Sequence, residues 1–195
     1  MTISSPLALV DAALRDGADL RLRVAATCAE AIVAAAAAIV DCVRRDGKVF
    51  FFGNGGSAAD AQHLAAEFTG RFQLERRALP AIALTTDTSA LTAIGNDYGF
   101  AAIFSRQLEA LGRAGDVAVA ITTSGTSPNI MAAVAACRRL GIHTIGLSSS
   151  RGTEFGRTVD HPILVPSPHT ARVQELHLTI GHLLCELVER ALFPQ

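Results

Sequence analysis

Two pairs of polar residues, each at helical spacing, have the side chains with which this chain could do chemistry. His63 and Glu67 are four residues apart in a segment of helical periodicity, so they share one helix face. Gln174 and His182 are eight residues apart near the C-terminus, also on one face, among largely apolar neighbours. A polar pair in such surroundings is costly unless it has partners. Together the four side chains offer two imidazole nitrogens and two oxygens, which could hold a divalent metal.

A plainer interpretation stays open for the same residues. His63 and Glu67 could be a solvated pair at positions i and i+4 with no ligand, and glutamine is an uncommon metal ligand. Glu175 and His177 point elsewhere on the last helix and are expected to be structural or solvated. The other histidines lie at the edges of strands or loops and are expected to be structural; they are His143, His161 and His169.

Residues 49–56 predict a buried strand followed by a glycine-rich turn. Val49-Phe50-Phe51-Phe52 is a short apolar run that ends abruptly at Gly53-Asn54-Gly55-Gly56. Ser57, with Asp60 three residues later, resembles a capping box and predicts that a helix begins at Ser57. The free N–H groups at that helix start would suit an anion, most simply a phosphate.

The glycine turn has a second interpretation as a dinucleotide-binding fingerprint. Residues 53–58 fit the pattern G-x-G-x-x-A, which is followed by an acidic residue about 20 positions on. Asp87 is the best candidate, and it comes 34 residues after Gly53 (87 − 53), which is late for a compact unit. No Gly-Lys-Ser/Thr follows the turn, so it is not a Walker loop either.

The rest of the chain alternates short apolar segments with helical ones. The further strands are expected at 81–84, 117–121, 144–147 and 162–165. Helical spacing follows at 100–111, at 128–140 with Ser127 and Pro128 as its start and Gly141 as its stop, and at 170–192. Residues 95–99 are expected to interrupt the helical segment after 88. This alternation predicts a parallel α/β sheet with ligands at the carboxyl ends of its strands.

The loops at those carboxyl ends contain hydroxyl groups and little positive charge. In order they are GNGGS, TTDTS, TTSGTS, SSS and PSP. One such loop means little, because Ser and Thr are ordinary turn residues. Several at one edge of the sheet favour a neutral site that binds phosphate or sugar hydroxyls by hydrogen bonds.

Residues from about 7 to 45 predict one or two long helices ahead of the sheet. Ile32, Ala36, Ile39 and Val43 form a heptad-like apolar stripe among alanines. The stripe could pack on the chain's own sheet or against another subunit, and the pattern does not decide between them.

Composition limits the classes of function. The chain has 195 residues and a net charge of −1, so it lacks the basic surplus typical of nucleic-acid binding. The N-terminus does not resemble a signal peptide, and the longest apolar run, 31–40, is short of the ~20 residues that span a membrane. Four cysteines without a CxxC predict free thiols in a reducing cytoplasm; they are Cys28, Cys42, Cys137 and Cys185.

Four segments together resemble the phosphoheptose isomerases of the sugar isomerase (SIS) family. They are GNGGSAADAQHLAAEFTGRF, LTAIGNDYG, TTSGTSPNI and RVQELHLTIGHLLCELVE. The resemblance implies one SIS domain over residues 1–195, built as a three-layer α/β sandwich around a five-stranded parallel sheet. Residues 1–46 would then serve oligomerisation, in a homotetramer whose active sites lie at subunit interfaces and bind one zinc ion each.

The resemblance also assigns roles to residues of this chain. It places zinc on His63, Glu67, Gln174 and His182, and the acid/base pair on Glu67 and His182. The expected substrate contacts lie in the glycine turn and the helical segment after it, at residues 96–97, in the loop TTSGTS and in the C-terminal helical segment; they are Asn54, Gly55, Gly56, Ser57, Glu67, Asn96, Asp97, Thr122, Thr123, Ser124, Ser127 and Gln174. Thr122 stands where Ser is more usual and Thr126 where Asn is common, which bears on fine substrate preference.

The implied reaction converts sedoheptulose 7-phosphate to D-glycero-D-manno-heptose 7-phosphate through an enediol. Two alternatives remain: a non-catalytic SIS protein of the replication initiator-associating type, and a sensor or isomerase of another sugar phosphate. Residues 171–177 resemble a segment of the first alternative. Glu67, Asp97 and His182 favour the enzyme, because a scaffold has no chemical need for them.

Overall fold

The predicted apolar segments form one parallel sheet in the computed structural model, which describes residues 5–194. The strand order is β2-β1-β3-β4-β5, and every neighbouring pair is parallel. The strands are β1 (Val49–Gly53), β2 (Ala81–Ala83), β3 (Val117–Ile121), β4 (His143–Ser149) and β5 (His161–Val165). The prediction of a five-stranded parallel sheet is therefore confirmed.

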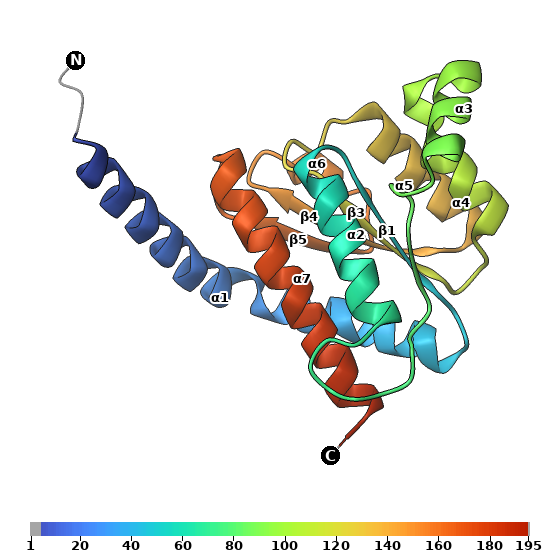
Figure 1. The fold of residues 1–195 in the computed structure, drawn as a ribbon, viewed down its shortest axis with the longest axis horizontal. Coiled ribbons are helices and arrows are strands. Elements are labelled where there is room, and N and C mark those ends of the chain that lie inside the picture. The colour runs from blue at the N-terminus through green and yellow to red at the C-terminus, as the bar shows by residue number, and fades with distance from the viewer. Residues whose placement is uncertain (1–4, 195) are drawn as a thin grey trace.

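Helices cover both faces of the sheet, which makes three layers (Figure 1). One face carries α1 (Pro6–Arg44), α2 (Gly56–Thr69) and α7 (Thr170–Leu192). The other carries α3 (Thr88–Tyr98), η1 (Phe100–Ala102), α4 (Ser105–Leu111), α5 (Pro128–Leu140) and α6 (Thr153–Gly156). Strand β1 feeds both cores, because successive side chains point to opposite faces: Phe51 lies in the first, Phe50 and Phe52 in the second.

Helix α1 is a single helix of 39 residues. Its apolar stripe, Ile32, Ala36, Ile39 and Val43, is buried in the chain's own core, against the sheet face that α7 also covers. The N-terminal half of α1 extends away from the body (Figure 1), and apolar side chains such as Leu7 and Leu14 are exposed there. By length and composition alone α1 could cross a membrane, with a mean hydropathy of 1.9 in its best window, but 44% of that window is buried inside this chain.

Two local predictions are wrong. Helix α2 begins at Gly56, not Ser57, and its N-cap is Gly55 at φ 57° with no side-chain cap. Ser57 is buried and packs against Gly53, where an added Cβ would lie 2.7 Å from the Ser57 Cβ, so Ser57 is inside the helix and cannot cap it. The predicted interruption at 95–99 is also wrong, because α3 runs on to Tyr98 and ends at Gly99, φ 83°.

The bounds of α5 and α7 follow their local signals. Helix α5 begins at Pro128 after the N-cap Ser127 and ends at Gly141, whose φ of 69° is left-handed. Helix α7 has the predicted bounds, whereas the predicted helix at 100–111 is divided into η1 and α4.

Candidate active site

His63, Glu67 and His182 meet in space, although 119 residues separate the two histidines in the chain. The Nε2 atoms of the two imidazoles are 2.8 Å apart, and Oε1 of Glu67 is 3.4 Å from Nε2 of His63. The three ligand atoms lie within 4.8 Å of one another. We call these residues the α2–α7 cluster. It is partly open to solvent, since the side chains of His63 and Glu67 are 45% and 22% exposed.

Close packing of α2 on α7 brings the cluster together. A Cβ at Gly181 would lie 2.5 Å from Cδ2 of Leu64, so a glycine there lets α2 approach α7 closely. Leu64 follows His63 and Gly181 precedes His182, so this contact also sets the distance between the two imidazoles. The i, i+4 spacing on α2 then adds the Glu67 carboxylate on the same side.

The donor set of the cluster fits a divalent metal. Zinc in proteins is held by imidazole nitrogens and carboxylate oxygens at about 2.0–2.2 Å, so its ligand atoms crowd within a few ångströms of one another. Here two imidazole nitrogens face each other directly with a carboxylate oxygen beside them. Gln174, two turns before His182, lies with its amide against the glycine turn, because a Cβ at Gly56 would be 2.7 Å from its Nε2.

The glycine turn is joined to the start of α5 by a pair of amides. Nδ2 of Asn54 donates to Oδ1 of Asn129 at 2.9 Å, and Nδ2 of Asn129 donates to Oδ1 of Asn54 at 2.8 Å. Asn129 is buried. Strands β1 and β3 are neighbours in the sheet, and the chain crosses over from them to opposite faces. Parallel sheets bind ligands at the carboxyl ends of two such strands. Sequence reasoning missed Asn129, because its partner is 75 residues away.

The hydroxyl loop after β3, residues 122–127, is shaped by its own side chains. Oγ1 of Thr122 accepts from the N–H of Gly125 at 3.2 Å, and Oγ of Ser124 accepts from the N–H of Thr126 at 3.3 Å. The carbonyl of Thr123 accepts from Oγ of Ser149 at 2.6 Å. Ser127 makes no side-chain capping bond to α5. The loop is therefore a preformed turn at the carboxyl end of the sheet, beside the glycine turn.

Asn96 and Asp97 lie elsewhere. They are exposed at the end of α3, where Nδ2 of Asn96 donates to Oδ1 of Asp97 at 2.8 Å. Helix α3 packs on the second core, across the sheet from α2 and α7. Within the described part of one chain, these two residues are thus placed apart from the α2–α7 cluster.

His177 has the predicted structural role, five residues before His182 on the same helix. It is 1% exposed, and its ring Nε2 bonds the carbonyl of Ser148 at 3.1 Å. Burial lowers the pKa of His177 to about 4, so this imidazole is neutral at pH 7. His169 is the N-cap residue of α7, and Glu175 pairs with Arg172 at 2.9 Å.

The sequence gives no sign of a buried ion pair beside the cluster. Nε of Arg76 lies 2.8 Å from Oε1 of Glu189, and the two side chains are 1% and 2% exposed. They are 113 residues apart, so no local spacing connects them.

Comparison with known proteins gives the family to which the chain belongs. Residues 14–149 match the SIS domain family, and the chain belongs to that family. A phosphoheptose isomerase of Roseiflexus sp. RS-1 is 53% identical over 177 residues, covering 91% of this chain and 90% of the relative. One from Solidesulfovibrio magneticus is 53% identical over 187 residues, covering 96% and 91%.

Solved structures agree with these relatives. The phosphoheptose isomerase of Neisseria gonorrhoeae superposes with a TM-score of 0.89 at 45% identity, covering 94% of this chain and 98% of that one. The enzyme of Francisella tularensis superposes with a TM-score of 0.92 at 37% identity, covering 96% and 100%. Within the SIS family, the chain is therefore similar to phosphoheptose isomerases over nearly its whole length.

Proposed function

We propose that this chain is a phosphoheptose isomerase that converts sedoheptulose 7-phosphate to D-glycero-D-manno-heptose 7-phosphate. The observation that carries the proposal is the convergence of His63, Glu67 and His182, from α2 and α7, within 4.8 Å. That convergence occurs in a chain 53% identical to proteins named phosphoheptose isomerase. A scaffold of the replication initiator-associating type would have no use for these groups, and nothing observed favours that alternative.

The reaction moves two protons, and the cluster has two groups to move them. Glu67 takes the proton from C1 of the ketose and returns it to C2, through a cis-enediol. His182 moves the hydroxyl proton between O2 and O1, a general acid/base role suited to imidazole. The ligand atoms of Glu67 and His182 lie within 4.8 Å of each other, which supports a role for both groups at adjacent carbons of one substrate.

A zinc ion is the cofactor that this donor set would hold. His63, Glu67, Gln174 and His182 are the proposed ligands, and the amide of Gln174 is near the glycine turn, on the substrate side. When bound, a divalent metal polarises a carbonyl oxygen and makes the neighbouring C–H more acidic. His63 has no separate acid/base role in this proposal and serves to hold the metal.

The phosphate of the substrate would bind at the hydroxyl loop. Residues Thr122, Thr123, Ser124 and Ser127 lie there ahead of α5, whose N-terminus favours an anion. The other proposed substrate contacts are Asn54, Gly55, Gly56, Ser57, Asn96, Asp97 and Gln174. Asn54 is already fixed by Asn129, whereas Ser57 is buried and its backbone N–H donates to the carbonyl of Asn54 at 3.1 Å, so Ser57 would shape the glycine turn around the substrate.

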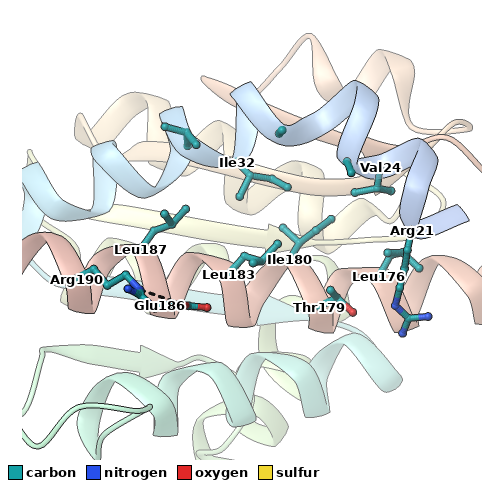
Figure 2. A pocket seen from close by; sticks show the side chains of 13 residues that line it. Arg21, Val24, Ile32, Leu176, Thr179, Ile180, Leu183, Glu186, Leu187 and Arg190 are labelled. Carbon is teal, nitrogen blue, oxygen red and sulfur yellow. Dashed lines mark hydrogen bonds and ion pairs between the residues drawn. The ribbon is translucent and has the colours of Figure 1, made fainter. Parts of the chain in front are cut away.

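We propose that the chain is one SIS domain, 1–195, that assembles into a homotetramer through its N-terminal helix. Between α1 and α7 runs an apolar groove of about 440 Å³, lined by Val24 and Ile32 from one helix and Ile180 and Leu183 from the other (Figure 2). Leu183 is 40% exposed there. A second copy of this chain would cover these side chains, and would also explain the apolar surface of α1 without a membrane.

Shared active sites would follow from such an assembly. Asn96 and Asp97, on the far face of one chain, could then complete the site of a neighbour. A cytoplasmic location suits the sugar-phosphate substrate, and all four cysteines are free and buried, as expected in a reducing compartment. Binding of nucleic acid or membrane is not part of the proposal.

The decisive assay is incubation with sedoheptulose 7-phosphate, with and without a chelator, following aldose formation. We expect turnover that the chelator abolishes and added zinc restores. No turnover by the metal-loaded protein would overturn the proposed function. For assembly, light scattering should give four chains for the wild type and fewer for Leu183→Glu. The control is Leu111→Glu, which changes a side chain of similar exposure on α4.

A further inference from the structure

The loop between α2 and β2, residues 70–80, passes beside the α2–α7 cluster without regular secondary structure. Figure 1 shows it running past the C-terminal end of α7 before it returns to the sheet. A loop of this length without strand or helix bonds must satisfy its backbone groups in some other way. In this chain, two buried charged side chains do so.

The first is the carboxylate of Glu189, which accepts four hydrogen bonds from the loop. Oε1 accepts from the N–H of Phe72 at 2.9 Å and from Nε of Arg76 at 2.8 Å. Oε2 accepts from the N–H groups of Gln73 at 2.9 Å and Leu74 at 3.0 Å. Three successive backbone N–H groups of the loop therefore converge on one side chain of α7.

The second is the guanidinium of Arg76, which binds the carbonyl groups at the end of α2. Its Nη2 donates to the carbonyl of Glu67 at 2.7 Å, and its Nη1 donates to that of Phe68 at 2.9 Å. Nη1 also donates to the carbonyl of Gly70 at 3.1 Å. These are carbonyls that a helix C-terminus leaves unpaired. The backbone at Glu67 is thus tied, through Arg76, to Glu189.

The loop also touches the other member of the acid/base pair. The ring of Phe72 lies against the imidazole of His182, with centroids 5.3 Å apart and planes at 31°. Glu189 follows His182 by seven residues, two turns along the same face of α7. Phe72 is therefore held by its own N–H on Glu189 while its ring bounds one side of the His182 imidazole.

Stability alone is a poor reason for such an arrangement. Removing two charges from water is costly, and apolar residues of similar volume often replace a buried ion pair without loss of stability. An apolar pair could not, however, accept three backbone N–H groups or bind the carbonyls of α2. What these two side chains supply is a fixed position for the loop relative to both helices.

We propose that Glu189 and Arg76 are positioning residues, which set Glu67 through the end of α2 and His182 through Phe72. The inference rests on the proposed function, since it concerns the same acid/base pair. A displacement of about 1 Å in such a pair can lower the rate about 100-fold. Positioning of Glu67 and His182 should therefore be visible in kcat.

The charge state of Glu189 agrees with this geometry. Burial by itself would raise the pKa of the Glu189 carboxyl, but the N–H groups of Gln73, Phe72 and Leu74 and the side chain of Arg76 outweigh it and hold the pKa below its ordinary value. The carboxylate is thus ionised at pH 7 and accepts all four bonds.

The test uses Glu189→Gln, Phe72→Leu and a matched control. In Glu189→Gln an amide NH2 replaces an oxygen that accepts hydrogen bonds, so it faces donors and the loop must move. Phe72→Leu keeps an apolar side chain but removes the ring against His182, and it should fold even if Glu189→Gln does not. Glu109→Gln breaks an exposed pair with Arg139, at 2.7 Å, on the other face of the sheet.

We expect kcat to fall about 10-fold to 100-fold in Glu189→Gln and less in Phe72→Leu, with KM changed less than about threefold. Glu109→Gln should match the wild type. A second readout, independent of turnover, is the proton NMR signal of the His182 ring in metal-free protein. It should move in Glu189→Gln, which keeps the Phe72 ring, and stay in place in the control.

The outcomes are separable. Folded Glu189→Gln with kcat within twofold of wild type and an unmoved His182 signal overturns the proposal. If Glu189→Gln does not fold, a kcat within twofold of wild type in folded Phe72→Leu overturns the proposal. A wild-type protein without isomerase activity would contradict the proposed function instead, and the His182 signal would still decide whether the loop positions that ring.

Discussion

Two polar clusters involve α7, one shared with α2 and one shared with the loop of residues 70–80, and they differ in how completely their atoms are hydrogen-bonded. In the α2–α7 cluster, two imidazole nitrogens and a carboxylate face one another, partly open to solvent. In the pair of Glu189 and Arg76, both side chains are 2% exposed or less, and the carboxylate accepts four hydrogen bonds. The second cluster has no capacity left for a ligand.

The two clusters therefore use their charged side chains for different purposes. A saturated, buried cluster fixes the backbone around it and resists change. A cluster whose donor atoms face one another can exchange partners, which binding a metal and moving protons both require. We therefore expect changes in the first cluster to act mainly on chemistry, and changes in the second to act on stability as well.

Glu67→Gln should have the largest effect on activity. Loss of the base should lower kcat about 1,000-fold, within the range for general acid/base groups, because an amide cannot take the C1 proton. The free energy of unfolding should change by less than about 1 kcal/mol, since the side chain is partly exposed. Aldose formation and urea unfolding measure the two effects. Near-normal turnover would contradict the assignment of Glu67.

Arg76→Met should have the largest effect on stability. Removing one partner of a buried pair costs about 3–5 kcal/mol, and we expect the lower end because three backbone N–H groups still bind Glu189. The check is urea unfolding at pH 7 and fixed protein concentration.

The pH dependence of that loss has a definite sign. The folded-state pKa of Glu189 is lowered, so its contribution is present above the ordinary value of 4.5 and is lost as the pH falls through the folded value. The stability difference between wild type and Arg76→Met should therefore narrow as the pH falls below 4.5. An equal difference at pH 7 and pH 3.5 would show that Glu189 is not the partner that matters.

His177→Gln should change the acid sensitivity of the core. The folded pKa is lowered from 6.5 to about 4, so the folded state binds fewer protons than the unfolded one between these values. The contribution of the neutral His177 imidazole to the free energy of unfolding is fully present above pH 6.5 and decreases as the pH falls toward 4. At pH 5 it has decreased by about 2 kcal/mol. Between pH 7 and pH 5 the variant should lose about 2 kcal/mol less than the wild type. Equal losses would contradict the neutral, buried imidazole.

Gly56→Ala should have the smallest effect. The new Cβ would meet the amide of Gln174, the end of a flexible side chain, at 2.7 Å, so the amide would move and the backbone would not. We expect stability within about 1 kcal/mol of wild type and kcat/KM lower by about fivefold, because a proposed ligand is displaced. Unchanged zinc content and unchanged kcat/KM would exclude Gln174 as a ligand.

The sequence predicted those features that have local signals. Apolar runs gave the five strands, Ser127 and Pro128 gave the start of α5, and helical spacing gave the bounds of α7. Spacing also put His63 with Glu67 and Gln174 with His182 on common faces. The contact between α2 and α7 could be expected only from the family resemblance, because residue spacing within one helix does not show which other helix it packs against.

The errors and omissions have a common origin in contacts that local patterns do not describe. The capping-box prediction failed because Gly55 turns the chain at positive φ, and the helix starts with Ser57 already packed on Gly53. Asn129 and Glu189 were missed because their partners are 75 and more than 110 residues away. Local sequence patterns show where helices lie in the chain, whereas long-range contacts such as these fix how the helices and loops pack against one another.

The most direct test of the central claim is isomerisation in deuterium oxide. The wild-type protein, loaded with zinc, should convert sedoheptulose 7-phosphate to the aldose and introduce deuterium at C2 of the product, since Glu67 exchanges its proton with solvent during the enediol step. Glu67→Gln should form the aldose, and incorporate the label, about 1,000-fold more slowly. Aldose formed at the wild-type rate by Glu67→Gln would contradict the account.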